Sequence, residues 1–285
     1  MTLLLQISDP HFGTERPAVV EALLRLAARE QPDLAVLSGD ITQRARRSQF
    51  AAARAFVDRL GAMPSLVIPG NHDIPLFNVF ARVLHPYANH RRVFGADLEP
   101  QFESRELLVI GVNTARQSRH TDGEVSAEQI ERVARRLERA TPLQLRVIVT
   151  HHPVAAVTAD DTNNLLHGHE PAIRRWAQAG ADLIVGGHIH LPYVLPLADR
   201  MQIARPVWAV QAGTALSTRV RGQISNSVNL IRYDAGQRGA RQAVVARYDY
   251  EDGSDAFVPV LQHELDLATT HASLSSATAR AVGPS

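Results

Sequence analysis

The chain has 285 residues, of which 45% are hydrophobic, so it can bury a substantial core in one large domain or two modest ones. Its 30 basic and 29 acidic residues give a formal net charge of +1, which provides no strong signal for a nucleic-acid partner. The absence of cysteine excludes disulfides, thiolate metal sites and cysteine nucleophiles, so any metal here must bind to nitrogen and oxygen.

The first predicted element is a short apolar run, residues 3–7, which polar residues follow at once. No basic segment precedes it, so the run predicts a strand and not a signal peptide. No later apolar run approaches the length of about 18 residues that a membrane span requires. We therefore expect a cytoplasmic protein without a membrane span.

Short apolar runs then alternate with segments of helical period. The runs predict buried strands at 3–7, 34–37, 66–68, 107–112, 145–149 and 183–185. The segments between several of them predict helices at 18–30, 49–60, 126–139 and 171–180. Ser126 with Gln129 resembles a capping box, and Pro171 fits the first turn of the fourth helix. This alternation is typical of an α/β protein.

After about residue 191 the predicted strands follow one another closely, with no comparable helix between them. They are 193–197, 207–211, 228–233, 243–250 and 257–263, and they predict a second, mostly antiparallel sheet. No Pro-rich or Gly-rich linker separates the two halves, so we expect one domain over residues 1–266. Residues 267–285 are mostly small and polar, which predicts a flexible tail.

Polar clusters follow five of the predicted strands. They are Asp9-Pro10-His11, Gly39-Asp40, Gly70-Asn71-His72-Asp73, His151-His152-Pro153 and Gly187-His188-Ile189-His190. Each cluster alone could be a turn or a loop with a buried imidazole. The carboxyl ends of strands line the ligand crevice of an open α/β sheet, so the five clusters can converge. Since they carry only nitrogen and oxygen ligands, together they predict a metal site.

The ordered set D-x-H, G-D, G-N-H-D, H and G-H-x-H resembles the calcineurin-like metallophosphoesterase superfamily. The resemblance spans about residues 3–233, and GNHD and GHIH are its most specific parts. The D-P-H opening, the HHP block and residues 123–126 are similar to the class III cyclic nucleotide phosphodiesterase branch. The resemblance implies a four-layer α-β-β-α sandwich of two mixed sheets flanked by helices.

It also implies two divalent or trivalent metal ions, with Fe, Mn, Zn, Co and Ni all left open. The implied ligands of one ion are Asp9, His11, Asp40 and His190, and those of the other are Asp40, Asn71, His151 and His188. A shared carboxylate such as Asp40 offsets the repulsion between two cations about 4 Å apart. The implied nucleophile is a hydroxide that bridges the metals.

His72 and Asp73 are the implied catalytic residues. His72 would contact the phosphate, where it either stabilises charge in the transition state or protonates the leaving oxygen. Asp73 would orient the ring of His72, and a turn-stabilising carboxylate is the alternative. We expect His152 to support its neighbours rather than bind metal, because adjacent residues seldom reach the same ion.

Other polar residues have weaker patterns. Arg219 and Arg221 are candidate substrate-binding residues that could reach a phosphate, and exposed surface arginines are the alternative. His167 and His169 look like a ligand pair, but no ligand of the superfamily maps there, so an exposed loop is favoured.

The leading hypothesis is a phosphodiesterase for a small molecule, with 3′,5′-cyclic AMP as the best single substrate. The alternatives are a glycerophosphodiesterase, another phosphodiesterase or pyrophosphatase, a nuclease of the same superfamily and a non-catalytic scaffold. The complete ligand set argues against a scaffold, and the lack of a basic stripe argues against a nuclease. Members of the superfamily often build dimer contacts from segments such as the one after residue 194, so a homodimer is a further expectation.

Overall fold

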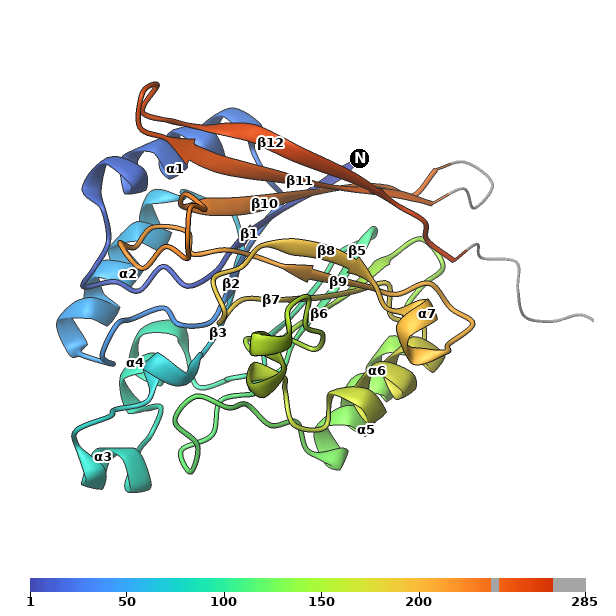
Figure 1. The fold of residues 1–285 in the computed structure, drawn as a ribbon, viewed down its shortest axis with the longest axis horizontal. Helices are drawn as coiled ribbons and strands as arrows, with labels where there is room; N and C mark the ends of the chain where they lie inside the picture. Colours follow the sequence, from blue (N-terminus) through green and yellow to red (C-terminus); the bar gives the residue numbers. More distant parts are fainter. Residues whose placement is uncertain (237–240, 269–285) are drawn as a thin grey trace, which may run out of the picture.

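The computed structural model describes residues 1–236 and 241–268, which form two six-stranded sheets packed face to face (Figure 1). The first sheet has the order β12 (Ala256–Leu265), β11 (Gln242–Glu251), β10 (Ser227–Asp234), β1 (Thr2–Ile7), β2 (Leu34–Ser38), β3 (Ser65–Ile68). The second has the order β4 (Gln101–Glu103), β5 (Leu107–Gly111), β6 (Leu145–Val149), β7 (Leu183–Gly186), β9 (Trp208–Gln211), β8 (Tyr193–Pro196).

Both sheets are mixed. Strands β1, β2 and β3 are parallel to one another, as are β5, β6, β7 and β9. The remaining pairs are antiparallel. Because the parallel strands end on the same side, the loops that follow them meet there.

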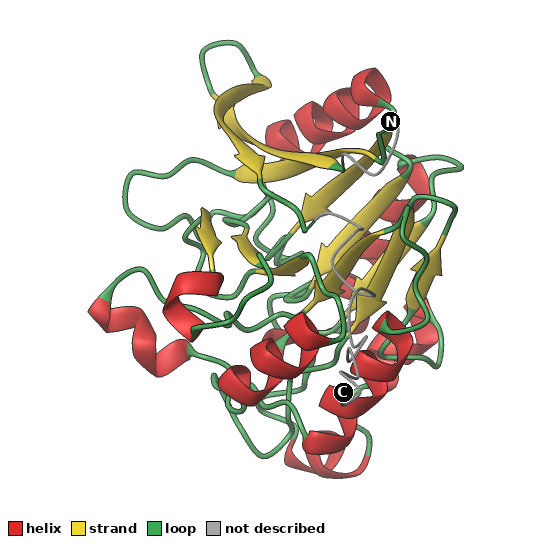
Figure 2. Cartoon of the chain, turned by 90° about the vertical axis from the view of Figure 1, so that its right-hand side faces the viewer, coloured by secondary structure: helices red, strands yellow, loops and turns green. Residues whose placement is uncertain are grey.

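Helices cover the outer face of each sheet (Figures 1 and 2). The α-helices are α1 (Pro17–Glu30), α2 (Arg47–Arg59), α3 (Val79–Leu84), α4 (Ala88–Phe94), α5 (Ala127–Leu137), α6 (His169–Gln178) and α7 (Ala198–Met201). Two 3₁₀ turns, η1 (Asn71–Asp73) and η2 (Ala159–Asn164), lie in loops beside the sheets.

Three apolar layers hold this arrangement together. Successive residues of β1 face opposite sides, so that Leu5 packs with α1 and α2 while Leu4 packs against the second sheet. On the far side of the second sheet, Ile148 packs with α5 and α6 around the fully buried Trp176. The predicted four-layer α-β-β-α sandwich is confirmed.

The prediction of a separate antiparallel sheet after residue 191 is wrong. Strands β8 and β9 join the second sheet, whereas β10, β11 and β12 extend the first sheet beside β1. β10 runs antiparallel to β1, with Ile231 opposite Leu4. This pairing satisfies the hydrogen-bonding groups along β1, which would otherwise form an exposed sheet edge.

The predicted helices are present as α1, α2, α5 and α6, and the short helices α3, α4 and α7 were not predicted. The capping box of α5 is confirmed: the Ser126 hydroxyl accepts from the Gln129 amide at 3.2 Å, and the Gln129 side chain accepts from the Ser126 amide at 3.0 Å. Pro171 lies in the first turn of α6, as expected.

No helix in residues 1–236 and 241–268 is both long and apolar enough to cross a membrane. Within the tail predicted over 267–285, residues 269–285 lie outside the described part of the chain. The single domain over residues 1–266 stays a prediction.

Candidate metal centre

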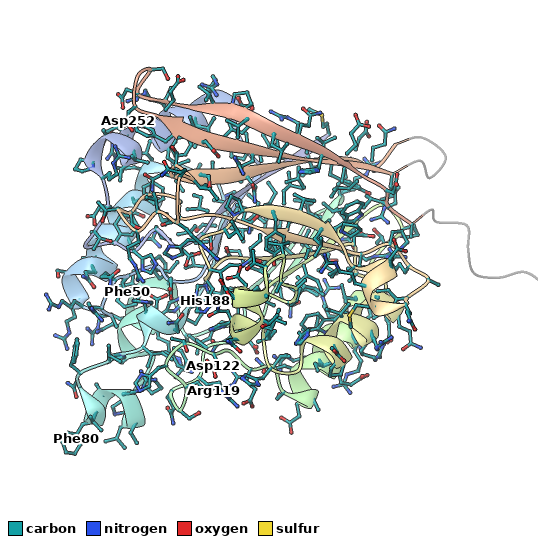
Figure 3. All side chains as sticks on the ribbon, in the orientation of Figure 1. Phe50, Phe80, Arg119, Asp122, His188 and Asp252 are labelled. Atoms are coloured by element: carbon teal, nitrogen blue, oxygen red, sulfur yellow. The ribbon has the colours of Figure 1, made fainter. Side chains whose placement is uncertain are left out.

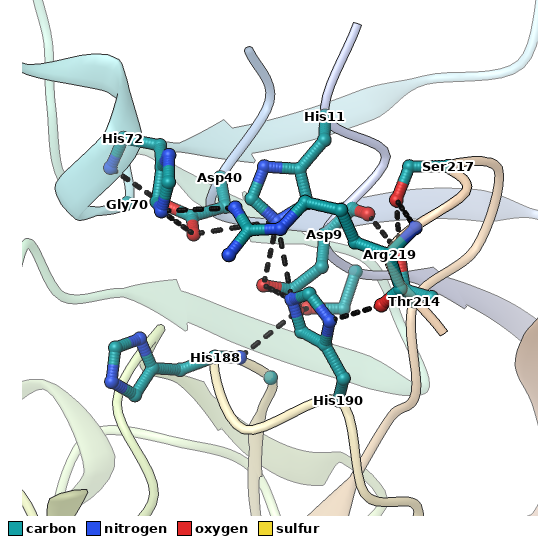
Figure 4. A network of polar contacts seen from close by, with 12 residues as sticks. Asp9, His11, Asp40, Gly70, His72, His188, His190, Thr214, Ser217 and Arg219 are labelled. Carbon is teal, nitrogen blue, oxygen red and sulfur yellow. Dashed lines mark hydrogen bonds and ion pairs between the residues drawn. The ribbon is translucent and has the colours of Figure 1, made fainter. Parts of the chain in front are cut away.

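All seven predicted metal ligands lie together at the carboxyl ends of the parallel strands. Figure 4 labels five of them: Asp9, His11, Asp40, His188 and His190. The seven ligands come from the loops after β1, β2, β3, β6 and β7: Asp9, His11, Asp40, Asn71, His151, His188 and His190. The two sheets therefore contribute to one site, although its residues are up to 181 positions apart in the sequence.

Local backbone strain marks the same residues. Nine non-glycine residues of the described chain have a positive φ, and five of them are predicted ligands: Asp9 at 50°, His11 at 44°, Asp40 at 49°, His188 at 74° and His190 at 55°. Residues other than glycine rarely adopt this backbone conformation, and those that do are often found at functional sites. Here the conformation turns the ligands away from the strands and toward one another.

The first cluster consists of Asp9, His11, Asp40 and His190. The Nε2 atoms of His11 and His190 are 3.1 Å apart, and the Oδ1 of Asp9 lies 3.3 Å from the Nε2 of His190. The other carboxylate oxygen of Asp9 accepts hydrogen bonds from the Ser8 hydroxyl and the His188 amide, at 2.7 and 2.9 Å. Oδ1 is buried without a hydrogen-bond partner, which is what a ligand position requires.

The second cluster consists of Asp40, Asn71, His151 and His188. The Oδ1 of Asn71 lies 3.2 Å from the Nε2 of His151 and 3.1 Å from the Nδ1 of His188. The Oδ1 of Asp40 lies 3.2 Å from the same Nε2 of His151. An amide oxygen, a carboxylate oxygen and two imidazole nitrogens thus point at one volume.

Asp40 lies between the clusters and presents one oxygen to each. Its Oδ2 is 3.6 Å from the Nε2 of His11 in the first cluster, while its Oδ1 faces His151 in the second. A single carboxylate oriented in this way fits a ligand shared by two cations. The residues present therefore fit a pair of metal ions.

Backbone carbonyls set the ring orientation of two ligands. The Nδ1 of His151 donates to the Ser38 carbonyl at 2.9 Å, and the Nδ1 of His190 donates to the Arg219 carbonyl at 2.5 Å. A carbonyl only accepts, so each Nδ1 carries a proton, which leaves Nε2 as the ring nitrogen that can bind a metal.

The electrostatics of the site favour cations. Burial would raise the pKa of Asp9 and of Asp40, but His190 and His151, respectively, lower both pKa values well below their usual range. Burial lowers the pKa of His11 to about 3 and, together with His151, that of His188 to about 4. Against the effect of burial, Asp40 raises the pKa of His151 to about 9, and Asp9 likewise raises the pKa of His190. These two rings would release a proton when a metal binds, because a metal needs neutral imidazoles beside ionised carboxylates.

His72 lies next to the clusters with its ring held between two groups. Its Nδ1 donates to the Gln43 carbonyl at 3.0 Å, so its Nε2 accepts from the guanidinium of Arg219 at 3.1 Å. Its Nε2 is 4.0 Å from the Oδ2 of Asp40, close to the bridging position. Figure 4 shows Arg219 reaching over the site toward His72.

The predicted contact between Asp73 and His72 is wrong. The buried carboxylate of Asp73 accepts from the amides of Ile41, Thr42 and Gly70 at 3.0, 2.8 and 2.9 Å, and from the Thr42 hydroxyl at 2.8 Å. The η1 turn directs Asp73 away from the cleft and His72 toward it. Asp73 thus joins the loop of Asp40 to the loop of Asn71, which agrees with the alternative of a turn-stabilising carboxylate.

His152 is fully buried beside His188, yet both of its ring nitrogens already have partners. Nδ1 lies 2.8 Å from the Thr114 hydroxyl, and Nε2 donates to the Thr121 carbonyl at 2.9 Å. This arrangement agrees with a supporting role. His167 is exposed and lies 3.4 Å from the Asp122 carboxylate, and the Nδ1 of His169 donates to the Leu166 carbonyl, so neither reaches the centre.

A cleft of about 420 Å³ opens over the two clusters, and both candidate arginines line it. Arg221 is fixed by a bidentate ion pair with the buried Asp161 of η2, at 2.8 and 3.1 Å. Arg219 forms no ion pair with a carboxylate of the described residues, and it contacts His72 and the Gln43 side chain. Arg219 is therefore the arginine that is free to meet a phosphate.

Several residues that shape the site carried no signal in the sequence. Ser38, Gln43 and Thr121 act through backbone carbonyls, which any residue type provides. Asp161 and Thr114 act through side chains, but their partners are 60 and 38 positions away. Only the distance to a ligand in the folded chain could have identified them.

The fold and the site define a metal-dependent hydrolase that acts on phosphoric esters. The chain belongs to the calcineurin-like phosphoesterase family, whose model matches residues 2–192. The family uses a dinuclear metal centre, so the cofactor is a pair of metal ions.

Two curated relatives are similar to this chain. A probable cyclic nucleotide phosphodiesterase of Synechococcus sp. is 28% identical over 211 residues, which are 68% of this chain and 76% of the relative. The glycerophosphodiester phosphodiesterase GpdQ of Enterobacter lignolyticus is 40% identical over 86 residues, which are 25% of this chain and 29% of the relative.

Solved structures share the fold at low identity. Purple acid phosphatase PPD1 from yellow lupin has a TM-score of 0.70 at 11% identity, covering 92% of this chain. This chain spans about half of that phosphatase, 53% of its length. A dimetal phosphatase from Danio rerio has a TM-score of 0.63 at 14% identity, covering 94% of this chain and 99% of that one.

Proposed function

We propose that the chain hydrolyses phosphodiesters at this centre, with 3′,5′-cyclic AMP as the best single substrate. The observation that carries the proposal is the carboxylate of Asp40, which presents one oxygen to each of two ligand clusters directly beside His72. The first cluster would hold one metal ion and the second cluster the other. When bound, such a pair of cations supplies activation of water and neutralisation of charge on the phosphate.

The residues of the chain would divide the remaining work. Arg219 would turn from His72 to an oxygen of the substrate, because a phosphate is a stronger acceptor than a neutral imidazole. His72 keeps its ring orientation through the Gln43 carbonyl and then directs Nε2 at the phosphate or the leaving oxygen. Protonation of the leaving oxygen requires a second proton on the ring, whereas charge stabilisation requires only this position.

Charge in the cleft supports a diester over a monoester. Apart from the ligands, the lining groups with formal charge are Arg219, Arg221, Asp160 and Asp161. They sum to no net charge, so the lining offers no surplus cationic group for the second negative charge of a monoester, whereas a monoanionic diester does not need one. A volume of about 420 Å³ also leaves room for a substituent on each side of the phosphate.

Similarity to the Synechococcus protein supports a cyclic nucleotide, and glycerophosphodiesters are the second candidate because of the similarity to GpdQ. The direct test compares kcat/KM for bis-p-nitrophenyl phosphate and p-nitrophenyl phosphate on one metal-loaded preparation. Preference for the diester is expected, and a clear preference for the monoester contradicts the proposal. Asp40→Asn should lose the diester activity, which shows that the activity belongs to this site.

Cyclic AMP and a glycerophosphodiester then need assays of their own, because an activated aryl ester does not report on the natural leaving group. We also infer a cytoplasmic location and a homodimer, to be tested by cell fractionation and by sedimentation velocity.

A further inference from the structure

An exposed apolar surface lies next to the cleft, on residues 76–84. It consists of Leu76, Phe77, Val79, Phe80, Val83 and Leu84, here named the α3 patch. These are half of the twelve large hydrophobic side chains that are exposed in the described part of the chain. Residues Phe77 and Phe80 are 79% and 83% exposed, and Figure 3 shows Phe80 at the outer corner of the molecule. Contiguous apolar exposure of this kind marks an interaction surface.

Unpaired positive charge accompanies the patch. Arg44, Arg46, Arg47, Arg91 and Arg92, here named the arginine collar, are exposed. No carboxylate of the described residues lies within ion-pair distance of them, whereas the nearby Arg54 and Arg59 pair with Asp58 and Glu21. The only carboxylates between residues 41 and 96 are Asp58, which is paired, and Asp73, which is buried.

Contacts join the collar to the patch. The guanidinium of Arg44 lies over the ring of Phe77, 5.4 Å from its centroid. The Asn89 side chain of α4 donates to the Ala45 carbonyl at 2.9 Å, which ties the helix that carries Arg91 to the loop of Arg44. Helices α3 and α4 are consecutive in the sequence and lie at the same corner of the fold (Figure 1). Apolar and cationic groups thus share one region of the surface.

We propose that the α3 patch and the arginine collar bind an anionic phospholipid surface. Exposed aromatic and aliphatic side chains insert at the boundary between headgroups and acyl chains, while surrounding arginines attract the anionic headgroups. A second copy of the chain fits less well, because a two-fold interface would place each collar close to its own copy. The apolar side chains project from the surface, and no exposed, unpaired carboxylate between residues 41 and 96 would repel an anionic headgroup. Both properties match a deformable anionic lipid layer.

The α3 patch lies close to the metal centre, so lipid binding would bear on the choice of substrate; this step rests on the proposed function. A hollow of about 160 Å³ is lined by Leu76 of the patch, by Arg44 of the collar, and by Asn71 and His72. Asn71 and His72 also line the main cleft. A phosphodiester carried on a lipid headgroup could therefore reach His72 from the surface to which α3 binds.

Vesicle co-sedimentation of the full chain tests the proposal. The probes are vesicles of phosphatidylcholine mixed with phosphatidylglycerol and vesicles of phosphatidylcholine alone. Binding to the mixed vesicles is expected at low salt, with a loss at high salt. The double variant Phe77→Ser/Phe80→Ser should lower the partition coefficient at least about tenfold, since it removes two large apolar side chains from the interface. Arg44→Gln/Arg91→Gln/Arg92→Gln should abolish the preference for phosphatidylglycerol.

The matched control is Val260→Ser/Leu261→Ser, which removes two exposed apolar side chains from β12, away from α3 (Figure 1), and should leave binding unchanged. No binding to mixed vesicles, or equal binding by wild type and the Phe77/Phe80 variant, overturns the proposal. So does conversion of a dimer to a monomer by that variant in sedimentation velocity, or binding to poly-glutamate but not to vesicles. Vesicle binding without diester cleavage would support the lipid-binding proposal and would count against the proposed function alone.

Discussion

Replacing Asp73 with alanine should destabilise the protein strongly, although Asp73 faces away from the cleft. Its carboxylate accepts four hydrogen bonds, three from backbone amides and one from the Thr42 hydroxyl. A buried donor left without a partner costs about 1 to 3 kcal/mol. The lower end applies here, because the variant also removes a buried charge and leaves space that water can enter.

Four donors at about 1 kcal/mol each give a loss on the order of 4 kcal/mol in the free energy of unfolding. That is a large share of the roughly 5 to 15 kcal/mol of a typical domain. Asp73→Asn should lose about half as much, since one oxygen still accepts. Asp33→Ala is the matched control: the exposed Asp33 accepts only from the Leu3 amide, at 2.8 Å, so its loss should be about 1 kcal/mol or less.

Urea unfolding followed by circular dichroism, with a chelator present, measures these losses without a contribution from metal binding. A loss for Asp73→Ala equal to that for Asp33→Ala would refute the assignment of Asp73 as the tie between the two ligand loops. Where the variant remains folded, its metal affinity should also fall, because Asp40 and Asn71 lie on the loops that Asp73 joins.

Three further predictions concern single residues. His72→Ala should keep its metals by elemental analysis and lose about 10² to 10⁴-fold in kcat; equal losses for aryl and alkyl leaving groups would favour charge stabilisation over protonation of the leaving oxygen. Gly70→Ala should bind less than two ions per chain, because a Cβ there would overlap the backbone nitrogen and Oδ1 of Asp40; full occupancy by elemental analysis would contradict this. Burial, with a smaller contribution from Arg91, lowers the pKa of His90 from 6.5 to about 4, so the stability that its neutral ring contributes is complete above pH 6.5 and is lost as the pH falls toward 4. Between pH of about 7 and about 4.5, the wild type should therefore lose roughly 2 to 3 kcal/mol more than His90→Phe in urea unfolding, and equal losses would refute this account.

The strand-end clusters could be predicted because they combine two local signals, an apolar run and the polar residues that end it. Parallel strands deliver the residues that follow them to one edge of their sheet, which explains why each cluster lies at a strand end. Asp9 follows β1 of the first sheet and His190 follows β7 of the second, so their contact also depends on how the two sheets pack. Sheet membership was different. Ile231 pairs with Leu4, and no local pattern in either segment specifies a partner 227 positions away.

Side-chain direction within a cluster was also beyond the sequence. Asp73 follows His72 directly, yet the η1 turn sends the two side chains to different sides of the loop. Arg219 and Arg221 are the same residue type, two positions apart, and only the ion pair between Arg221 and Asp161 distinguishes their roles. The run 76–84 has the apolar content of a core segment, so its exposure followed only from the fold.

The rate of bis-p-nitrophenyl phosphate hydrolysis, measured as metal is titrated into metal-stripped protein, tests the dinuclear phosphodiesterase centre most directly. If Asp40 joins two ligand clusters as its two oxygens indicate, the rate should rise and level off at two metal equivalents per chain. A plateau at one equivalent, or a rate that does not respond to metal, would contradict the account.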